Sequence, residues 1–305
     1  KGLLFPPFFV RISSLFLKSI YFAAMKTKSF FTLCTALLFT LLFLGEKAQG
    51  YVGQTLFLDG FSFYVLTEDP FSKTGTVAVN SSRIFASEPY GVSIPQSLAF
   101  EQNPGFSYLV TEVGINCFNN DRYCTGVELP DSVTRIGYGA FQDAYSLKDI
   151  VLPKYLAAIE KETFAGCSSL ESIFLPDDLI GIGERAFAGC FKLTTINLEN
   201  ITSIAPNAFE YCHALENVNI SSKTEYLGER AFQTCNNLKH VKIGNGLQYI
   251  ESHTFYDCKA LESVEIGNGV QIIGTSAFSQ CKNLSSVTIG SSVQFIEPQA
   301  FYNCQ

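Results

Sequence analysis

The sequence contains ten cysteines and three histidines, residue types that can bind metals or carry redox and acid–base chemistry. Seven of the cysteines recur at one position of a repeating pattern: Cys167, Cys190, Cys212, Cys235, Cys258, Cys281 and Cys304. Ligands in a single row do not converge into a tetrahedron, and parallel side chains rarely reach the dihedral angle of a disulfide. We therefore predict a row of buried thiols that act as small apolar side chains.

Two further cysteines, Cys117 and Cys124, stand outside this row, and the tenth, Cys34, lies in a segment that we expect to be removed on export. Disulfides form and persist in exported proteins. Cys117 and Cys124 are therefore candidates for a disulfide that staples the start of the repeats, and two separate thiols are the alternative.

The three histidines, His213, His240 and His253, occupy three different positions of the repeat, so we expect them to point in different directions from the surface. The sequence has no G-x-S-x-G, H-E-x-x-H, phosphate-loop or dinucleotide-binding motif. The Gly-Asn-Gly runs around residues 245 and 268 lack the aspartates of calcium loops and are interpreted as turns. We predict that the chain is not an enzyme and binds no metal or small-molecule cofactor.

The charge distribution disfavours nucleic acid as a partner. The net charge is −7, but the first 50 residues hold six of the 21 basic residues and only one of the 28 acidic ones. The chain from Tyr51 onward therefore carries a net charge of −12. Such a chain repels phosphate backbones.

The segment Met25–Gly50 is typical of a secretory signal peptide. Lys26 and Lys28 precede a short apolar run, and Ala48-Gln49-Gly50 supplies small residues for cleavage. A retained membrane anchor is the alternative, although the run is short for a membrane span. We expect a secreted or cell-surface protein. Residues 1–24 are interpreted as a spurious upstream extension, and the chain is expected to be a fragment because it stops within a repeat.

A repeat of 23 residues dominates the rest of the sequence. Its clearest mark is a phenylalanine, and one step of 22 residues, between Phe187 and Phe209, interrupts the spacing. Aliphatic residues recur five residues before each phenylalanine and, from Phe141 to Phe278, also six, nine and eleven residues after it. The phenylalanines that mark the repeat are Phe118, Phe141, Phe164, Phe187, Phe209, Phe232, Phe255, Phe278 and Phe301.

These columns predict a repeat solenoid over residues 110–305, truncated at its C-terminal end. The alternating stretch predicts one short strand per repeat, and the strands are expected to form a parallel sheet on one face. The A-F-x-x-C-x-x-L stretch has helical spacing, so we expect short helical turns on the other face. The missing residue falls between Leu198 and Ile204, in a loop that can absorb it. Residues 51–109 do not repeat, and clusters such as Phe61–Val65 and Thr76–Val79 predict a small N-terminal β cap.

The unit resembles the BspA-like class of leucine-rich repeats. The segments that carry the resemblance are AFAGCFKLTTINL (186–198), AFQTCNNLKHVKI (231–243) and AFSQCKNLSSVTI (277–289). The class is common in secreted and surface proteins of anaerobic bacteria. The resemblance implies a solenoid fold and, in broad terms, an adhesive or protein-binding role.

Outward-facing positions of the predicted strands lie eight and ten residues after each phenylalanine. The core does not dictate their identities, so they are free to form a ligand surface. An exposed phenylalanine among small polar groups is a suitable anchor for a protein partner, and packing against a neighbouring side chain is the alternative. The predicted binding face comprises Val151, Phe174, Asn197, Asn219, His240, Lys242 and Glu265.

The sequence is compatible with three functions. The first is an adhesion scaffold that binds a surface or matrix protein of a host or a neighbouring cell. The second is a glycan-binding module, in which Asn197 and Asn219 would bind sugar hydroxyls, although only one aromatic residue is available there to stack on a sugar. The third is a targeting arm of a larger protein whose functional domain lies beyond residue 305.

Overall fold

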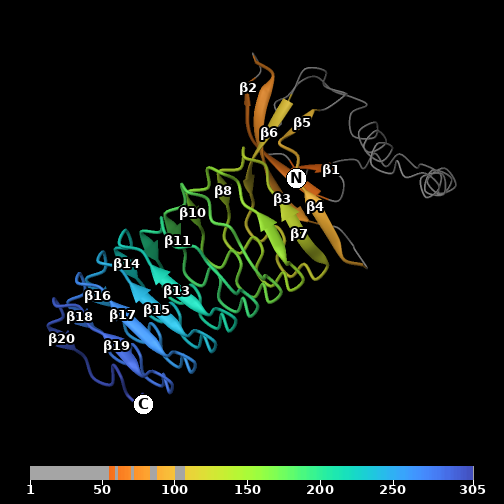
Figure 1. Ribbon diagram of the computed structural model, residues 1–305. Helices are drawn as coiled ribbons and strands as arrows, with labels where there is room; N and C mark the ends of the chain where they lie inside the picture. Colours follow the sequence, from red (N-terminus) through yellow and green to blue (C-terminus); the bar gives the residue numbers. More distant parts are fainter. Residues whose placement is uncertain (1–54, 59–60, 70–71, 83–87, 100–106, 305) are drawn as a thin grey trace, which may run out of the picture. The chain divides into compact units, whose positions relative to one another are not determined.

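Each repeat forms one coil, most coils pass through two short strands and a series of turns, and successive coils stack in register (Figure 1). The computed structural model describes residues 55–58, 61–69, 72–82, 88–99 and 107–304. The predicted signal peptide, Met25–Gly50, and the 1–24 extension lie outside the described residues. In the part that the structure describes, no helix is long and apolar enough to span a membrane. The predicted solenoid of 23-residue repeats is confirmed.

The first parallel sheet contains the predicted strands. In β15, His240 and Lys242 point outward while Val241 and Ile243 are buried, which is the alternation expected of a half-buried strand. Consecutive coils pair in register in two runs of strands, and an isolated bridge joins Ser172 to Thr195 in the coils between them. The strands are β4 (Tyr90–Ser93), β7 (Cys124–Glu128), β9 (Asp149–Val151), β13 (Asn217–Ile220), β15 (His240–Ile243), β17 (Ser263–Ile266) and β19 (Ser286–Thr288).

A second parallel ladder follows the aliphatic column that precedes each phenylalanine. Each strand has two residues, and from β8 to β18 the second one is a buried aliphatic residue. The 22-residue step leaves this ladder intact, because Ile204 pairs with Ile182 on one side and with Leu227 on the other. The strands are β8 (Arg135–Ile136), β10 (Ala158–Ile159), β11 (Gly181–Ile182), β12 (Ser203–Ile204), β14 (Tyr226–Leu227), β16 (Tyr249–Ile250), β18 (Ile272–Ile273) and β20 (Phe295–Ile296).

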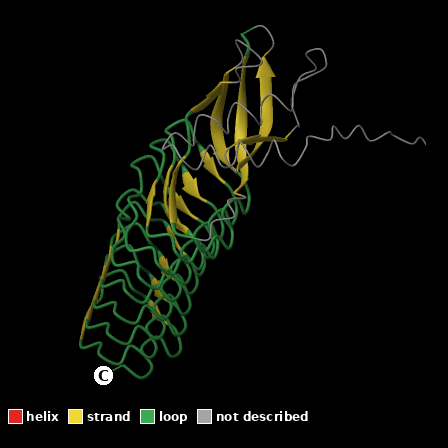
Figure 2. Ribbon diagram, turned by 90° about the vertical axis from the view of Figure 1, so that its right-hand side faces the viewer, coloured by secondary structure: helices red, strands yellow, loops and turns green. Residues whose placement is uncertain are grey.

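The third side of each coil differs from the predicted helical turns. The described residues contain turns and no helix there (Figure 2). In every coil, the residues two before and two after the phenylalanine have a positive φ, as Arg230 and Thr234 do around Phe232. Left-handed residues this close together stop a right-handed helix. We call this side of the coils the turn side.

The turn side is a third hydrogen-bonded ladder between coils. The phenylalanine N–H of each coil donates to the carbonyl that precedes the phenylalanine of the next coil, as Phe209 does to Ala231, and the eight such N···O distances are 2.6–2.9 Å. The two left-handed residues of each coil donate in the same direction; for example, Tyr211 donates to Gln233 at 2.9 Å. Backbone groups that a helix would pair internally are therefore paired with the neighbouring coil, which satisfies them equally well.

The phenylalanine rings form a continuous stack inside the coils. From Phe118 to Phe301, neighbouring rings lie 4.8–5.5 Å apart between centroids, with interplanar angles of 3–14°. Eight of the nine rings are fully buried. Truncating a buried phenylalanine to alanine typically costs about 3–5 kcal/mol, so this stack is a principal source of stability.

A mixed sheet caps the first coil, as predicted for residues 51–109. Strand β6 pairs in parallel with β3 on one side and with β8 on the other, so it crosses the predicted boundary at residue 110 and leads into the second ladder. Strand β4 similarly leads into the first sheet. Phe61 packs edge-on against Phe118, 5.9 Å between centroids, and so covers the open end of the ring stack. The remaining strands of the cap are β1 (Thr55–Leu58), β2 (Phe61–Asp69), β3 (Thr74–Ser82), β5 (Ser97–Ala99) and β6 (Ser107–Val113).

The seven column cysteines are thiols. Each Sγ lies 3.1–3.3 Å from the carbonyl oxygen of the phenylalanine in the preceding coil and donates to it. Burial raises the pKa of the six thiols from Cys167 to Cys281 well above the ordinary range, and it also raises the pKa of the half-buried Cys304. The Cys124 thiol donates to the Gly126 carbonyl at 3.7 Å, and burial raises its pKa to about 12. The disulfide of Cys117 and Cys124 stays a prediction.

We expect iodoacetamide at pH 8 to modify Cys304 before any other column cysteine, because only the thiolate reacts and burial keeps the others protonated and covered. Raising the pH from 7 to 9 should leave the modification of Cys212 and Cys235 almost unchanged, since both pKa values lie above this window. Mass spectrometry of digested protein measures each site, and labelling in urea is the control in which all sites react. Equal rates at Cys212 and Cys304 in the native protein would contradict the buried row.

Candidate functional site

The structure places six of the seven predicted face residues in one row on the first sheet. Asn219, Lys242 and Glu265 pair directly in strands β13, β15 and β17. Val151 lies in β9, and Phe174 and Asn197 hold the same position in the two coils that follow it. His240 lies in the adjacent outward row, opposite Asn217 and Ser263. All seven side chains are exposed.

Near one end of this outward row, next to the exposed Glu128, two consecutive side chains are apolar. The Phe174 side chain is 74% exposed and that of Val151 is 60% exposed. They occupy the same position in consecutive coils, so they form a single patch. Large apolar side chains that gain nothing from the core are typical of surfaces that are buried in a complex.

The other end of the outward row is polar. Lys242 Nζ lies 3.4 Å from Glu265 Oε2, and both side chains are about two-thirds exposed. A pair this exposed contributes about 0–1 kcal/mol to stability, so a partner can replace it at small cost. His240 Nδ1 lies 2.9 Å from Ser263 Oγ, and Asn197 Oδ1 accepts from the backbone N–H of Glu199 at 3.0 Å. The row thus offers an apolar anchor followed by amide and charged groups.

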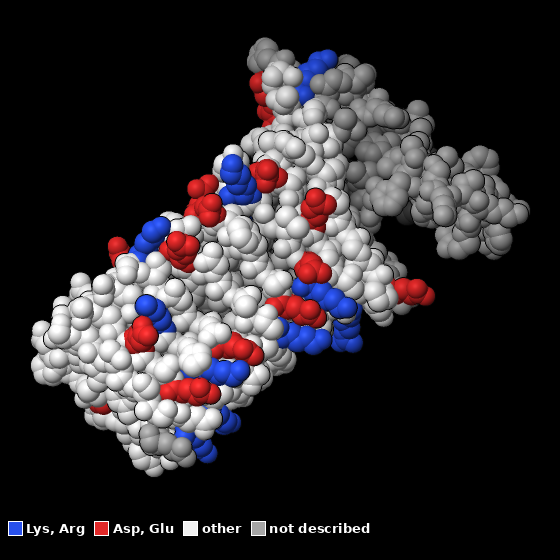
Figure 3. All heavy atoms as spheres, in the orientation of Figure 1, with Lys and Arg blue, Asp and Glu red and all other residues white. Residues whose placement is uncertain are grey.

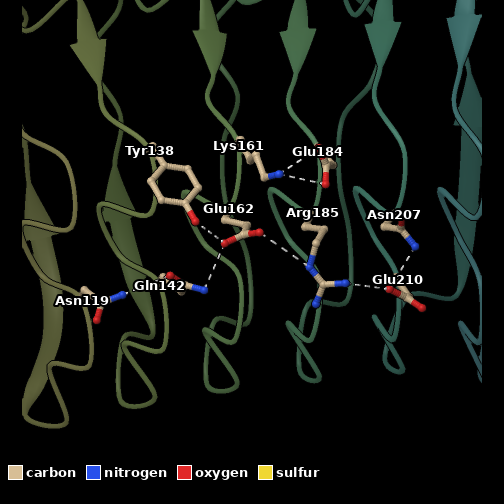
Figure 4. Close-up of polar contacts among 9 residues, drawn as sticks. All are labelled: Asn119, Tyr138, Gln142, Lys161, Glu162, Glu184, Arg185, Asn207 and Glu210. Carbon is tan, nitrogen blue, oxygen red and sulfur yellow. Dashed lines mark hydrogen bonds and ion pairs between the residues drawn. The ribbon is translucent and has the colours of Figure 1, made fainter.

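The turn side carries a polar network that the sequence analysis did not identify (Figure 4). Its centre is Arg185, whose Nε lies 3.9 Å from Glu162 Oε1 and whose Nη1 lies 3.3 Å from Glu210 Oε2. Tyr138 donates to Glu162 at 2.8 Å, and this bond raises the pKa of the tyrosine. The network extends across neighbouring coils through Asn119, Gln142 and Asn207.

The network residues stand two before or one after a phenylalanine, or three before it in the case of Tyr138. In the sequence, the sign of this network is therefore a repeat position at which acidic, basic and amide residues alternate from coil to coil. Basic and acidic side chains also lie next to one another elsewhere on the surface, without large patches of one sign on the face that Figure 3 shows. Among the described residues, no group of three or more metal-ligating side chains comes together.

Comparisons with known proteins agree with this fold. The model of one family, described as "BspA type Leucine rich repeat region (6 copies)", matches residues 102–216 and 202–305. The crystal structure of the pneumococcal vaccine antigen PcpA is similar, with a TM-score of 0.61 and 23% identity over 83% of this chain and 75% of that one. A leucine-rich cell surface protein from Faecalibacterium prausnitzii has a TM-score of 0.51 and 22% identity over 85% of this chain and 81% of that one. The search of curated proteins gave no significant match.

The neighbouring residues Ile173 and Phe174 test the inside–outside alternation directly. We expect Phe174→Ala to change the free energy of unfolding by no more than about 0.5 kcal/mol, since its side chain is exposed. Ile173→Ala removes a buried side chain and should cost about 2–5 kcal/mol. Urea denaturation monitored by circular dichroism measures both. A large loss for Phe174→Ala would mean that this ring packs against the protein itself.

Proposed function

Because the chain belongs to the BspA-type leucine-rich repeat family, we propose that it is an exported scaffold that binds a protein partner through the outward row of its first sheet. The partner is a surface or matrix protein of a host or neighbouring cell. The observation that carries the proposal is the exposed apolar pair of Val151 and Phe174, followed by the polar residues of the same row.

The composition of the row supports a protein partner. Binding hot spots are commonly aromatic side chains that enter a pocket of the partner, surrounded by groups that exclude water. Phe174 has the size and exposure for this role. Asn219 and the Lys242–Glu265 pair supply donors, acceptors and both signs of charge along the rim, which fix the orientation of a partner.

The rigidity of the coils supports the same function. Three ladders connect the coils: the two sets of strands, each of which is interrupted in places, and the turn side, which runs without a break. The outward row is therefore fixed in position before a partner arrives. A fixed surface loses little conformational entropy on binding, which favours affinity.

The N-terminal segment and the relatives support the proposed location outside the cell. Met25–Gly50 has the charge, apolar run and cleavage residues of a signal peptide. The F. prausnitzii protein of similar fold is described as a cell surface protein, and PcpA is described as a vaccine antigen. We therefore place this chain outside the cell, in secreted or surface-attached form.

Surface plasmon resonance of the purified chain against a panel of extracellular-matrix and secreted proteins tests the proposal. We expect Phe174→Ala to weaken binding at least about tenfold, and Lys242→Ala to weaken it less, because the aromatic anchor loses more buried area than a rim charge. Ile180→Ala is the matched control: Ile180 is 53% exposed but lies outside the outward row. Binding to none of the proteins, or equal binding by the wild type and Phe174→Ala, would refute the proposed face.

A further inference from the structure

Two consecutive repeats differ from all the others in the two residues that follow the phenylalanine. These residues are Ala165-Gly166 and Ala188-Gly189, whereas every other described coil has larger side chains in at least one of these positions. The turn side therefore has a hollow that is two coils wide, with a volume of about 540 Å³. We call it the Ala-Gly hollow.

The backbone does not require these two glycines. Gly166 and Gly189 have φ values of +74° and +75°, but Asp143 and Tyr211 hold the equivalent positions of the flanking coils with φ of 57° and 61°. A side chain is therefore compatible with this conformation in this fold. A Cβ on Gly189 would come no closer than 3.7 Å to its neighbours, which is ordinary contact. At Gly189 the missing side chain leaves open space, whereas at Gly166 it leaves room for the Asp143 carboxylate.

An aromatic wall closes one side of the Ala-Gly hollow. The Phe191 side chain is 48% exposed, and its ring is stacked on His213 with 5.3 Å between centroids and an interplanar angle of 8°. Tyr211 packs edge-on against the same histidine, 6.1 Å away. His213 Nδ1 lies 2.9 Å from the Thr234 carbonyl oxygen, a contact that holds the imidazole in place. Phe191 is thus a fixed, flat surface at the hollow.

Polar groups line the rest of the Ala-Gly hollow. The Asp143 carboxylate lies against Gly166, where its Oδ1 occupies the space that a Cβ on this glycine would need. Arg185 also lines the hollow, and its guanidinium is oriented by Glu162 and Glu210 (Figure 4). The lining therefore contains one carboxylate, Asp143, and one guanidinium, Arg185, beside the imidazole of His213. It offers an acceptor and a donor to a ligand that is itself neutral.

We propose that the Ala-Gly hollow binds a pyranose ring of a neutral glycan. The C–H face of the sugar packs on Phe191, and its hydroxyls donate to Asp143 and accept from Arg185. The hollow is an open depression of about 540 Å³, which leaves room for one sugar ring. A lysine side chain also fits an aromatic ring beside a carboxylate, and Glu162 and Glu210 neutralise Arg185, so a lysine-containing peptide is the competing ligand that the test below distinguishes. The hollow lies on the turn side, so this inference is independent of the protein-binding face.

Calorimetry of the full chain with a panel of neutral oligosaccharides, built from glucose, galactose, mannose and N-acetylglucosamine, tests this site. We expect at least one sugar to bind, Phe191→Ala to weaken its binding at least about tenfold, and Gly189→Asn to abolish it by filling the hollow. Asparagine tolerates the left-handed conformation, so Gly189→Asn should fold, and thermal denaturation checks this. Gln280→Asn, at the equivalent position of a distant coil, is the control that should bind as the wild type does.

Two results would overturn the proposal. One is the absence of binding to every sugar at millimolar concentration, including the case in which a lysine-containing peptide binds instead. The other is a sugar whose affinity is the same for the wild type and Gly189→Asn. Phe174→Ala should leave sugar binding unchanged, so a failure of the protein-binding proposal remains distinguishable from a failure of this one.

Discussion

A single coil of this chain cannot bury its own apolar side, and the rest of the structure depends on this constraint. The only cover available is the next coil, so each inward side chain must meet its counterpart one repeat later. The phenylalanine rings satisfy this condition at 4.8–5.5 Å, close to the spacing of about 4.8 Å between strands. Ring stacking, strand pairing and the turn-side ladder therefore share one repeat distance. The Sγ–H of each column cysteine bonds to the preceding coil across the same step.

The same constraint separates stability from recognition. Inward positions repeat because the neighbouring coil dictates them, while outward positions vary without cost to the core. The outward row of the first sheet uses this freedom to display Phe174 and the Lys242–Glu265 pair. The Ala-Gly hollow results from the same freedom, because two adjacent coils have small residues in place of larger side chains beside Phe191. One scaffold can therefore carry different ligands on different sides.

Much of the fold could be predicted from the sequence because its signals are periodic. The alternation around Val241 predicts a strand, and the column of phenylalanines predicts a shared core. The spacing of the repeat also predicts that Phe174 faces outward. The turn side could not be predicted in this way. Its spacing also suits a helix, and the left-handed residues that prevent one include Glu162 and Arg185, residue types that do not indicate a positive φ.

The hollow was missed for a related reason. Ala-Gly in two successive repeats is visible in the sequence, but its meaning depends on neighbours in other coils. Asp143 and Phe191 come together only when coils are stacked, and the orientation of Arg185 depends on Glu162 and Glu210 on either side. The site therefore depends on contacts between different positions of neighbouring repeats, which the pattern of a single repeat does not reveal.

Native-state hydrogen exchange, followed by nuclear magnetic resonance, tests the central claim that coils are joined on all three sides. The account predicts that the amides of Phe209 and Phe232 are protected as strongly as those of the central strand β15, because they donate to Ala231 and Thr254 of the next coil at 2.7 and 2.9 Å. Rapid exchange of the phenylalanine amides, with β15 still protected, would show that the turn side is an ordinary loop and would contradict the account.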